Sequence, residues 1–165
     1  MVVELISVGT ELLLGNIVNT NAQFLAEKCA SLGLSMYHQV TVGDNRERLA
    51  EDISTALKRA DIIILTGGLG PTEDDITKEV CADVMGFKLV EDPHTRERIE
   101  AYFKDGIYPV ITDNNWKQAL VPEGCKVLDN HNGTAPGLIM EKHEKTAILL
   151  PGPFNELKPL FLDEV

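Results

Sequence analysis

A glycine-rich segment is the part of the sequence best suited to chemistry. It runs from Thr66 to Thr77, has three glycines in four positions, and follows an apolar run at 62–65. Glycines let a backbone turn sharply and approach a ligand closely, and amides near a helix start attract anions. The segment lacks the Gly-Lys-Ser/Thr ending of a P-loop and the glycine spacing of a dinucleotide fingerprint. We therefore expect an anion-binding loop of another kind.

Two adjacent acids, Asp74 and Asp75, lie where this segment enters a predicted helix. A carboxylate at a helix start can be only a cap, which stabilises the helix by roughly 1 kcal/mol. Two acids beside a phosphate would repel it unless a cation lay between them. Mg²⁺ commonly binds one or two carboxylates together with substrate phosphates. Both interpretations are open at this point, and the magnesium interpretation is favoured.

Other small or polar segments also follow predicted strands. In an open α/β sheet, ligands bind at the carboxyl ends of the strands, so these segments are expected to meet the glycine-rich loop. Each can instead be an ordinary turn, Asp44 can be a plain helix cap, and Lys158 can be a solvated surface charge. The candidate binding residues are Gly9, Thr10, Asn21, Asp44, Thr66, Gly67, Gly68, Leu69, Gly70, Thr77, Gly133, Thr134, Pro151, Gly152 and Lys158.

Strand and helix patterns alternate along the chain, and this order must position the loops. Right-handed crossovers between such elements give a mostly parallel sheet covered on both faces. The expected strands are 2–8, 34–42, 61–66, 126–128, 138–140 and 146–150. The expected helices are 21–32, one opened by Asp44, 75–85, 93–103, 112–120 and one from Pro153 that is interrupted by Pro159.

Composition excludes several classes of protein. The chain has 165 residues, 15 basic against 26 acidic, and a net charge of −11, which argues against nucleic-acid binding and against electrostatic attachment to membranes. No apolar run approaches the length of a membrane span. The three cysteines form no C-x-x-C pair, and the start has no secretory signal, so a cytoplasmic protein with free thiols is expected. The four histidines form no zinc pattern.

Taken together, the motifs resemble a known family over nearly the whole chain. The molybdopterin-binding fold of the MoaB/MogA type is suggested by Thr66-Gly67-Gly68-x-Gly70, Asp75, Thr77 and Pro151-Gly152-Pro153. The N-terminal domain of competence/damage-inducible protein CinA is closer, through Gly9-Thr10-Glu11-Leu12-Leu13-x-Gly15, Asn19-Thr20-Asn21, Gly70-Pro71-Thr72-x-Asp74-Asp75 and Gly133-Thr134-Ala135-Pro136-Gly137. Two positions depart from the patterns: Leu69 replaces a usual Thr of the MogA-type loop, and Phe154 replaces a usual Pro of the CinA pattern.

The resemblance implies a three-layer α/β/α domain over residues 1–165 that forms a dimer or trimer. The acidic ending Asp163-Glu164-Val165 predicts either a domain cut from a longer chain or an unfinished last helix. It implies a small-molecule nucleotide or pterin phosphate as ligand. CinA-type domains are associated with metal-dependent ADP-ribose pyrophosphatase activity, for which Asp74 and Asp75 would bind a divalent metal such as Mg²⁺. Asp75 and Glu11 would be catalytic, with Glu11 orienting either the attacking water or a second metal. The alternatives are a non-catalytic molybdopterin or nucleotide-binding module, or molybdopterin adenylylation.

Overall fold

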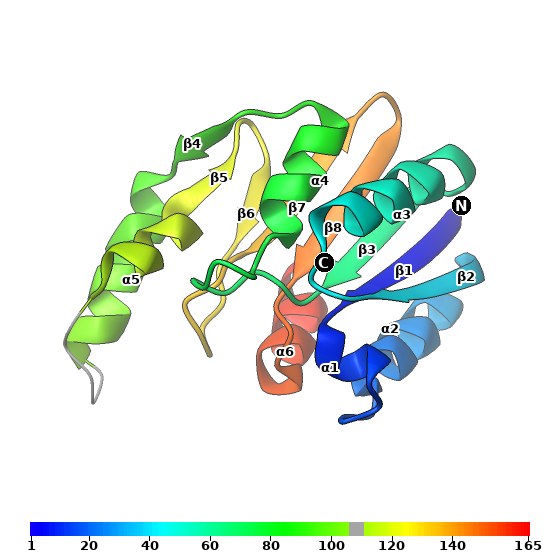
Figure 1. Cartoon of the computed structure of the whole chain (residues 1–165), viewed down its shortest axis with the longest axis horizontal. Coiled ribbons are helices and arrows are strands. Elements are labelled where there is room, and N and C mark those ends of the chain that lie inside the picture. Colours follow the sequence, from blue (N-terminus) through cyan, green and yellow to red (C-terminus); the bar gives the residue numbers. More distant parts are fainter. Residues whose placement is uncertain (106–110) are drawn as a thin grey trace.

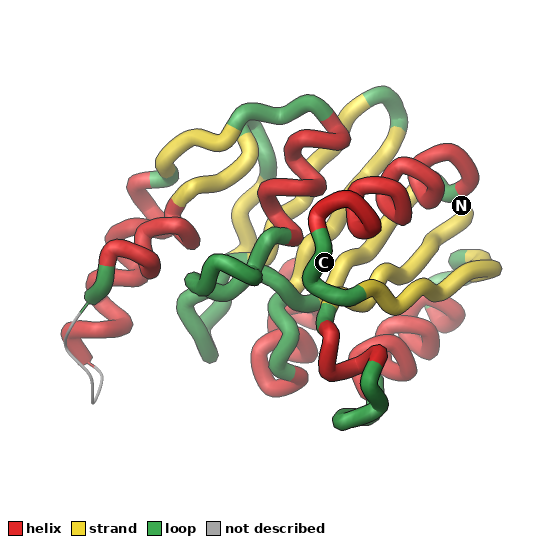
Figure 2. The backbone as a smooth tube through the Cα atoms, in the orientation of Figure 1, coloured by secondary structure: helices red, strands yellow, loops and turns green. Residues whose placement is uncertain are grey.

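The protein folds around a six-stranded sheet that carries helices on both faces (Figures 1 and 2). The computed structural model describes residues 1–105 and 111–165. The strands of this sheet are β1 (Val2–Val8), β2 (Ser35–Val42), β3 (Ile62–Thr66), β6 (Lys126–Leu128), β7 (Gly137–Lys142) and β8 (Lys145–Leu150). Their order is β2-β1-β3-β8-β7-β6; the pairs from β2 to β8 are parallel, and β7 is antiparallel to both neighbours. The expected mostly parallel sheet is confirmed.

Two hydrophobic layers, one on each face of the sheet, form the core. The helices are α1 (Thr10–Leu13), α2 (Thr20–Ser31), α3 (Arg46–Arg59), α4 (Thr77–Met85), α5 (Pro93–Asp105), the 3₁₀ helix η1 (Asp113–Ala119) and α6 (Phe154–Glu164). One layer joins α3 and α4 to the sheet, and the other joins α2 and α6 to its opposite face. Residues of β1 alternate between the layers, since Leu5 belongs to one and Ile6 to the other. The three-layer α/β/α architecture is therefore confirmed.

Two helix starts differ from the sequence expectation. Asp44 does not cap α3; Asn45 does, because its side chain accepts a hydrogen bond from the amide of Arg48 at 3.0 Å. The helix expected from residue 75 begins at Thr77, and its N-cap residue, Ile76, offers no side-chain acceptor. The interpretation of Asp44 and of Asp75 as helix caps is therefore wrong. Their carboxylates accept hydrogen bonds from other groups instead.

Pro159 does not interrupt the last helix, which runs without a break through α6. A proline removes one backbone donor, here the amide that would bond the carbonyl of Asn155. The side chain of Asn132 donates to that carbonyl instead, at 3.1 Å. A side chain from another part of the chain therefore replaces the hydrogen bond that the proline removes.

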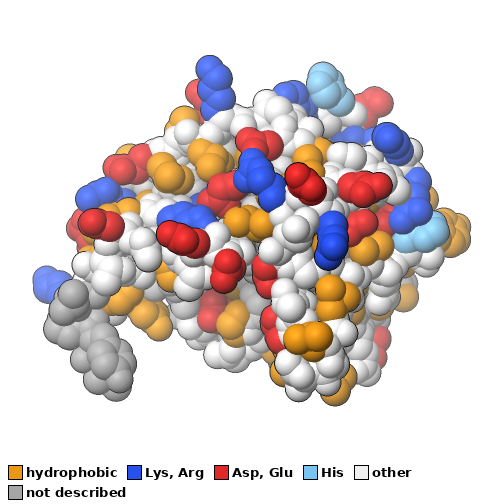
Figure 3. All heavy atoms as spheres, viewed as in Figure 1, with side chains coloured by type: hydrophobic (Ala, Val, Ile, Leu, Met, Phe, Trp, Pro, Cys, Tyr) orange, Lys and Arg blue, Asp and Glu red, His pale blue; other side chains and the backbone are white. Residues whose placement is uncertain are grey.

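Three short elements were not expected from the sequence. They are the one-turn helix α1 and the strands β4 (Leu89–Glu91) and β5 (Leu120–Pro122), which pair with each other outside the main sheet. Among the helices of the described part, none has the length and apolar character needed to cross a membrane. Acidic and basic side chains are both spread over the face shown in Figure 3, so that face has no continuous basic surface.

Candidate functional site

A cavity of about 730 Å³ opens at the carboxyl ends of β1, β3 and β8. These strands are neighbours in the sheet, although they are far apart in sequence. The loops that follow them contribute Gly9, Gly67–Gly70 and Pro151–Gly152 to the cavity wall. The helices α1 and α5 lie on opposite sides of this region (Figure 1). The motifs singled out in the sequence therefore meet because the parallel sheet brings the ends of its strands together.

The glycine-rich loop approaches its surroundings so closely that two of its glycines leave no room for a side chain. Gly67 has φ +88°, and a Cβ atom there would lie 2.4 Å from the carbonyl oxygen of Val8. Gly68 has φ +66°, and a Cβ atom would lie 2.1 Å from Oγ1 of Thr77. Both backbone angles also disfavour any residue other than glycine. The loop is thus held in a shape that keeps its backbone at the cavity wall.

Every charged side chain that the described residues contribute to the cavity wall is acidic. The lining carboxylates are Glu11, Asp44, Asp74, Asp75 and Glu156. Among the described residues that line the cavity, none is a lysine or an arginine. A phosphate placed here would meet like charge unless a cation came with it. Carboxylate oxygens are the donors that Mg²⁺ prefers, so this wall fits a hard divalent cation shared with ligand oxygens.

Asp75 is held in a tight turn. Its Oδ2 accepts hydrogen bonds from the Thr72 amide at 2.9 Å and from the Thr72 hydroxyl at 2.6 Å. In residues 1–105 and 111–165, no three His, Cys, Asp or Glu side chains lie close enough together to hold a metal ion. A cation bound by Asp74 and Asp75 would thus need further oxygen ligands from substrate or water, as is common for Mg²⁺.

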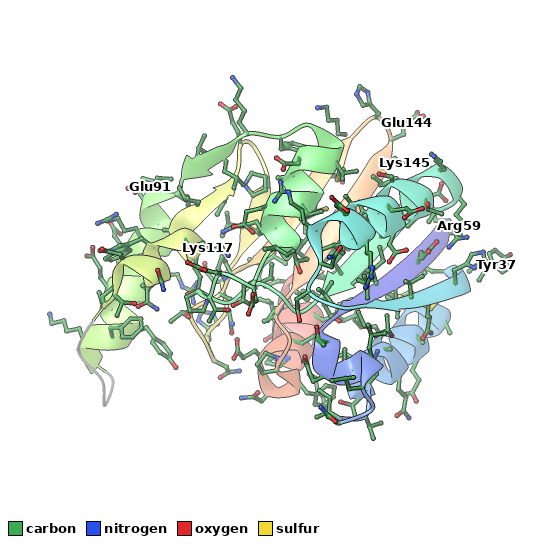
Figure 4. The ribbon with its side chains drawn as sticks, in the orientation of Figure 1. Tyr37, Arg59, Glu91, Lys117, Glu144 and Lys145 are labelled. Atoms are coloured by element: carbon green, nitrogen blue, oxygen red, sulfur yellow. The ribbon has the colours of Figure 1, made fainter. Side chains whose placement is uncertain are left out.

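The 3₁₀ helix η1 braces the loop from behind. Lys117 donates from Nζ to the carbonyl oxygen of Thr72 at 2.8 Å and to that of Asp75. Gln118 donates from Nε2 to the carbonyl oxygen of Leu69 at 3.2 Å. Figure 4 labels Lys117, which lies beside the loop that joins β3 to α4. These bonds satisfy carbonyl groups on the side of the loop that faces η1.

Side chains also link the other loops at this end of the sheet. Thr10 donates from its amide and its hydroxyl to Oδ2 of Asp44, at 3.1 and 2.9 Å, and so joins the loops after β1 and β2. Asn21 donates to the carbonyl oxygen of Gly152 at 2.7 Å and joins α2 to the loop after β8. Thr10 therefore acts beside the cavity rather than in its wall.

The structure brings most of the predicted site residues together and leaves three outside the wall. Thr10, Thr77 and Lys158 do not line the cavity. Thr77 is fully buried beneath Gly68, and Lys158 is exposed on α6, 5.8 Å from the ring centre of Phe154. The predicted residues that do line it are Gly9, Glu11, Asn21, Asp44, Thr66, Gly67, Gly68, Leu69, Gly70, Asp74, Asp75, Gly133, Thr134, Pro151 and Gly152.

Sequence reasoning missed several residues of the wall. Ile17 and Val18 lie in the same opening segment as Glu11, and that closeness in sequence could have indicated them. Glu156 lies four residues after Gly152 on α6; burial raises the pKa of its carboxyl group, and a hydrogen bond from Asn130 partly offsets this. Two further wall residues, on α5 and η1, are Tyr102 and Gln118, and nothing in their sequence neighbourhood pointed to the cavity.

The cysteines are not suited to nucleophilic chemistry. Cys29, Cys81 and Cys125 are free thiols, as expected. Burial raises the pKa of Cys81 to about 12 and that of Cys125 to about 11, and it also raises the pKa of Cys29. Because the thiolate is the reactive form, these groups stay protonated and inert at neutral pH.

Comparison with known proteins gives relatives along the whole chain. A protein of Caldicellulosiruptor bescii named as a competence-damage inducible protein is 59% identical over all 165 residues. The chain covers 40% of that relative's length. A solved structure of CinA from Thermoplasma acidophilum, described as of unknown function, is 33% identical with a TM-score of 0.91, covering 98% of this chain and 95% of the other.

More distant structures share the fold alone. The tungsten cofactor synthesizing protein MoaB from Pyrococcus furiosus is 18% identical, with a TM-score of 0.62 over 98% of this chain and 88% of the other.

The family described as "Probable molybdopterin binding domain" matches residues 4–165. The chain therefore belongs to the molybdopterin-binding-domain family, and within it to the CinA type.

Proposed function

We propose that the cavity binds ADP-ribose or a similar nucleotide and hydrolyses its pyrophosphate bond with the help of a divalent cation. One observation carries this proposal: a loop of closely packed glycines and five carboxylates share a cavity whose described wall has no basic side chain. Backbone amides can bind one phosphate of such a ligand, but they cannot balance its full charge. A cation held by carboxylates can do so.

The residues of the wall divide the work in this proposal. The amides of the glycine loop hold one phosphate, and Asp74 and Asp75 hold the cation. Glu11 lines the cavity from the loop after β1, where its carboxylate can orient a water molecule. A bound divalent cation supplies charge neutralisation and lowers the pKa of water. The turn at Thr72 and the hydrogen bonds from Lys117 hold Asp75 and the backbone of the segment that carries both aspartates.

The relatives support a small-molecule ligand and leave its chemistry as a proposal. The chain spans about 40% of the length of the curated relatives it matches. Family membership supports a pterin or nucleotide phosphate as ligand. That the protein is cytoplasmic and forms a dimer or trimer is likewise a proposal.

The first experiment measures AMP released from ADP-ribose with Mg²⁺, Mn²⁺ or Co²⁺. We expect cation-dependent release by the wild-type chain and a loss of at least about 100-fold in Asp74→Asn and Asp75→Asn, because even indirect partners of a metal contribute 10–100-fold. The substituted amide of Asp75→Asn keeps an oxygen that can accept from Thr72. Glu73→Gln is the matched control: this exposed acid of the same loop does not line the cavity and should retain activity.

Two results would contradict the proposal. One is full activity in both aspartate variants. The other is absence of AMP with every cation, which would favour a module that binds a nucleotide or molybdopterin without chemistry. In that case, nucleotides and pterins that bind only the folded state would still raise the melting temperature.

A further inference from the structure

Glu156 is a carboxylate of the cavity wall that has no separate role in the proposed function. It lies in the first turn of α6 and lines both the main cavity and a smaller one of about 240 Å³. Its Oε2 accepts a hydrogen bond from Nδ2 of Asn130 at 2.7 Å. Its Oε1 accepts none from the described residues, and it is not one of their buried unpaired side-chain atoms. One oxygen is therefore fixed, and the other is open to solvent or to a ligand.

The amide of Asn130 holds this carboxyl group in place. Asn130 is 2% exposed, and its Nδ2 also donates to the carbonyl oxygen of Ala135 at 2.9 Å. Its Oδ1 accepts a hydrogen bond from the amide of Asn132 at 3.0 Å. Because a carbonyl only accepts and a backbone amide only donates, these two bonds fix the orientation of the Asn130 side chain. The group that Asn130 presents to Glu156 is therefore a donor.

The start of α6 lies against the glycine-rich loop. A Cβ atom on Gly152 would lie 3.5 Å from Cα of Gly67, whose amide donates to the carbonyl oxygen of Leu150 at 3.0 Å. Gly133 packs against the carboxyl group itself, since a Cβ atom there would lie 2.3 Å from Oε2 of Glu156. Glu156 is thus in the first turn of the helix that follows the contact with the loop proposed to bind phosphate.

The ionisable groups around Glu156 are mainly acids. Those that share a cavity wall with it are Glu11, Asp44, Asp74 and Asp75 in the main cavity, and Asp129, His131, Asp163 and Glu164 in the smaller one. Of the basic groups nearby, His94 and Arg98 of α5 contact Asp129, and Lys158 of α6 lies over the ring of Phe154. None of the basic side chains in the described part of the chain forms an ion pair with Glu156.

A proton can neutralise Glu156 where no basic side chain does. Burial raises the pKa of its carboxyl group, and the hydrogen bond from Asn130 offsets part of that effect. An ionised carboxylate only accepts hydrogen bonds, whereas the protonated group also donates one. Because a phosphate oxygen is an acceptor, only the protonated form of Glu156 can bond it directly.

We infer that Glu156 contacts the ligand as a neutral carboxylic acid whose Oε1 donates a hydrogen bond to a phosphate oxygen, so that ligand binding takes up a proton. Oε2 continues to accept from Asn130 in this arrangement. The inference rests on the proposed use of the cavity as a phosphate site. It separates the wall into carboxylates that share a cation with the ligand and one that shares a proton with it.

Calorimetry tests the uptake of the proton. The probe is the analogue of ADP-ribose with a methylene bridge between its phosphorus atoms, which resists hydrolysis and whose phosphates do not titrate near neutral pH. Titrations at pH 8 with saturating Mg²⁺ in Tris and in HEPES differ in heat if binding takes up a proton from the buffer. We expect such uptake by wild type, and an affinity at least about fivefold higher at pH 6 than at pH 8, because the bound state holds the proton more tightly.

The variant Glu156→Gln separates protonation from a structural role. Its amide oxygen can accept from Asn130 while its amide nitrogen donates to the phosphate, so it imitates the neutral acid. We expect this variant to bind at pH 8 at least as tightly as wild type, without proton uptake. Glu164→Gln, on the same helix but only in the smaller cavity, and His131→Gln should both retain the uptake.

Several results would overturn the inference. They are binding of the analogue without proton uptake, uptake that persists in Glu156→Gln, uptake that is lost in His131→Gln, and no binding at all. If Glu156→Gln fails to fold, carbon-13 spectra of glutamate-labelled wild type decide, since no glutamate carboxyl signal should then become protonated on binding if the inference is wrong. Release of AMP from ADP-ribose without proton uptake leaves the hydrolase proposal standing. Proton uptake without hydrolysis does the reverse.

Discussion

Gly67 and Gly68 are the residues through which the loop after β3 gains its close fit. Each has a positive φ, and each would bring a Cβ atom within 2.4 Å of another atom. The neighbour of Gly67 is the backbone oxygen of Val8, which cannot move without disturbing β1. Gly15 also has a positive φ, at +71°, but faces open space. Gly15 and Gly67 therefore share a positive φ that favours glycine, but only Gly67 lies where a side chain would collide with a neighbour.

This pair gives a prediction about stability. Gly15→Ala should cost about 1 kcal/mol, the ordinary penalty for a side chain at positive φ. Gly67→Ala should cost about 1–3 kcal/mol more, because overpacking is added to the same backbone penalty. Urea unfolding followed by circular dichroism measures both values. Equal losses in the two variants would show that the contact with Val8 does not constrain the loop.

At the level of elements, the sequence predicted the strands and helices that have a clear apolar pattern and missed the short elements that have none. The strands and helices of the main sheet came from apolar patterns, as for the buried run of β3. The strands β4 and β5 have three residues each, too few for a pattern to show. The helix α1 has four residues and none is buried. Short elements are fixed by tertiary contacts, which no local pattern records.

Local sequence patterns also decided which residues of the candidate site could be predicted. Glycines and acids directly after strands were predictable, because parallel strands collect such loops at one edge. Tyr102 and Gln118 reach the cavity through the packing of α5 and η1, and their contribution depends on that arrangement. The role of Asp44 was misjudged because a side chain distant in sequence, that of Thr10, donates to its carboxylate.

One contact between elements should depend on pH. His94, near the start of α5, bonds through Nε2 to Asp129, after β6, at 2.9 Å, and this partner raises the pKa of the histidine. A raised pKa means that the folded state holds the proton more tightly, so the contact stabilises the fold below the histidine's ordinary pKa near 6.5. The stabilisation is lost as the pH rises through the higher value in the folded state.

We therefore expect His94→Gln to lower the melting temperature clearly at pH 5.5 and much less at pH 8.5. Differential scanning fluorimetry at both pH values measures the difference between variant and wild type. His38→Gln, at an exposed histidine on β2, serves as the control. A difference that is the same at both pH values would contradict an ionic contribution from the pair of His94 and Asp129.

At the level of the whole molecule, the charge of −11 and the acidic cavity wall act in the same direction. Both oppose the approach of a pyrophosphate ligand alone. A divalent cation should therefore bind together with the nucleotide. The localisation and oligomeric state expected from the sequence remain predictions.

This gives a prediction about ligand stabilisation. ADP-ribose in excess EDTA should leave the melting temperature unchanged, and ADP-ribose with Mn²⁺ should raise it. At a ligand concentration of 100 times Kd, the stabilisation reaches about 2.7 kcal/mol. KCl at matched ionic strength controls for simple screening of charge. An equal rise in EDTA would show that the cavity binds the nucleotide without a cation.

The order of the strands also bears on how the protein is made. β3 pairs with β8, and the amide of Gly67 donates to the carbonyl oxygen of Leu150, so one of the four parallel strands comes from residues translated well after the glycine loop. While residues 145–164 are still inside the ribosome, the glycine loop is already outside. The strand β8 and the helix α6, which complete the cavity wall, are not yet available. We therefore expect ligand capture only after translation has passed this point.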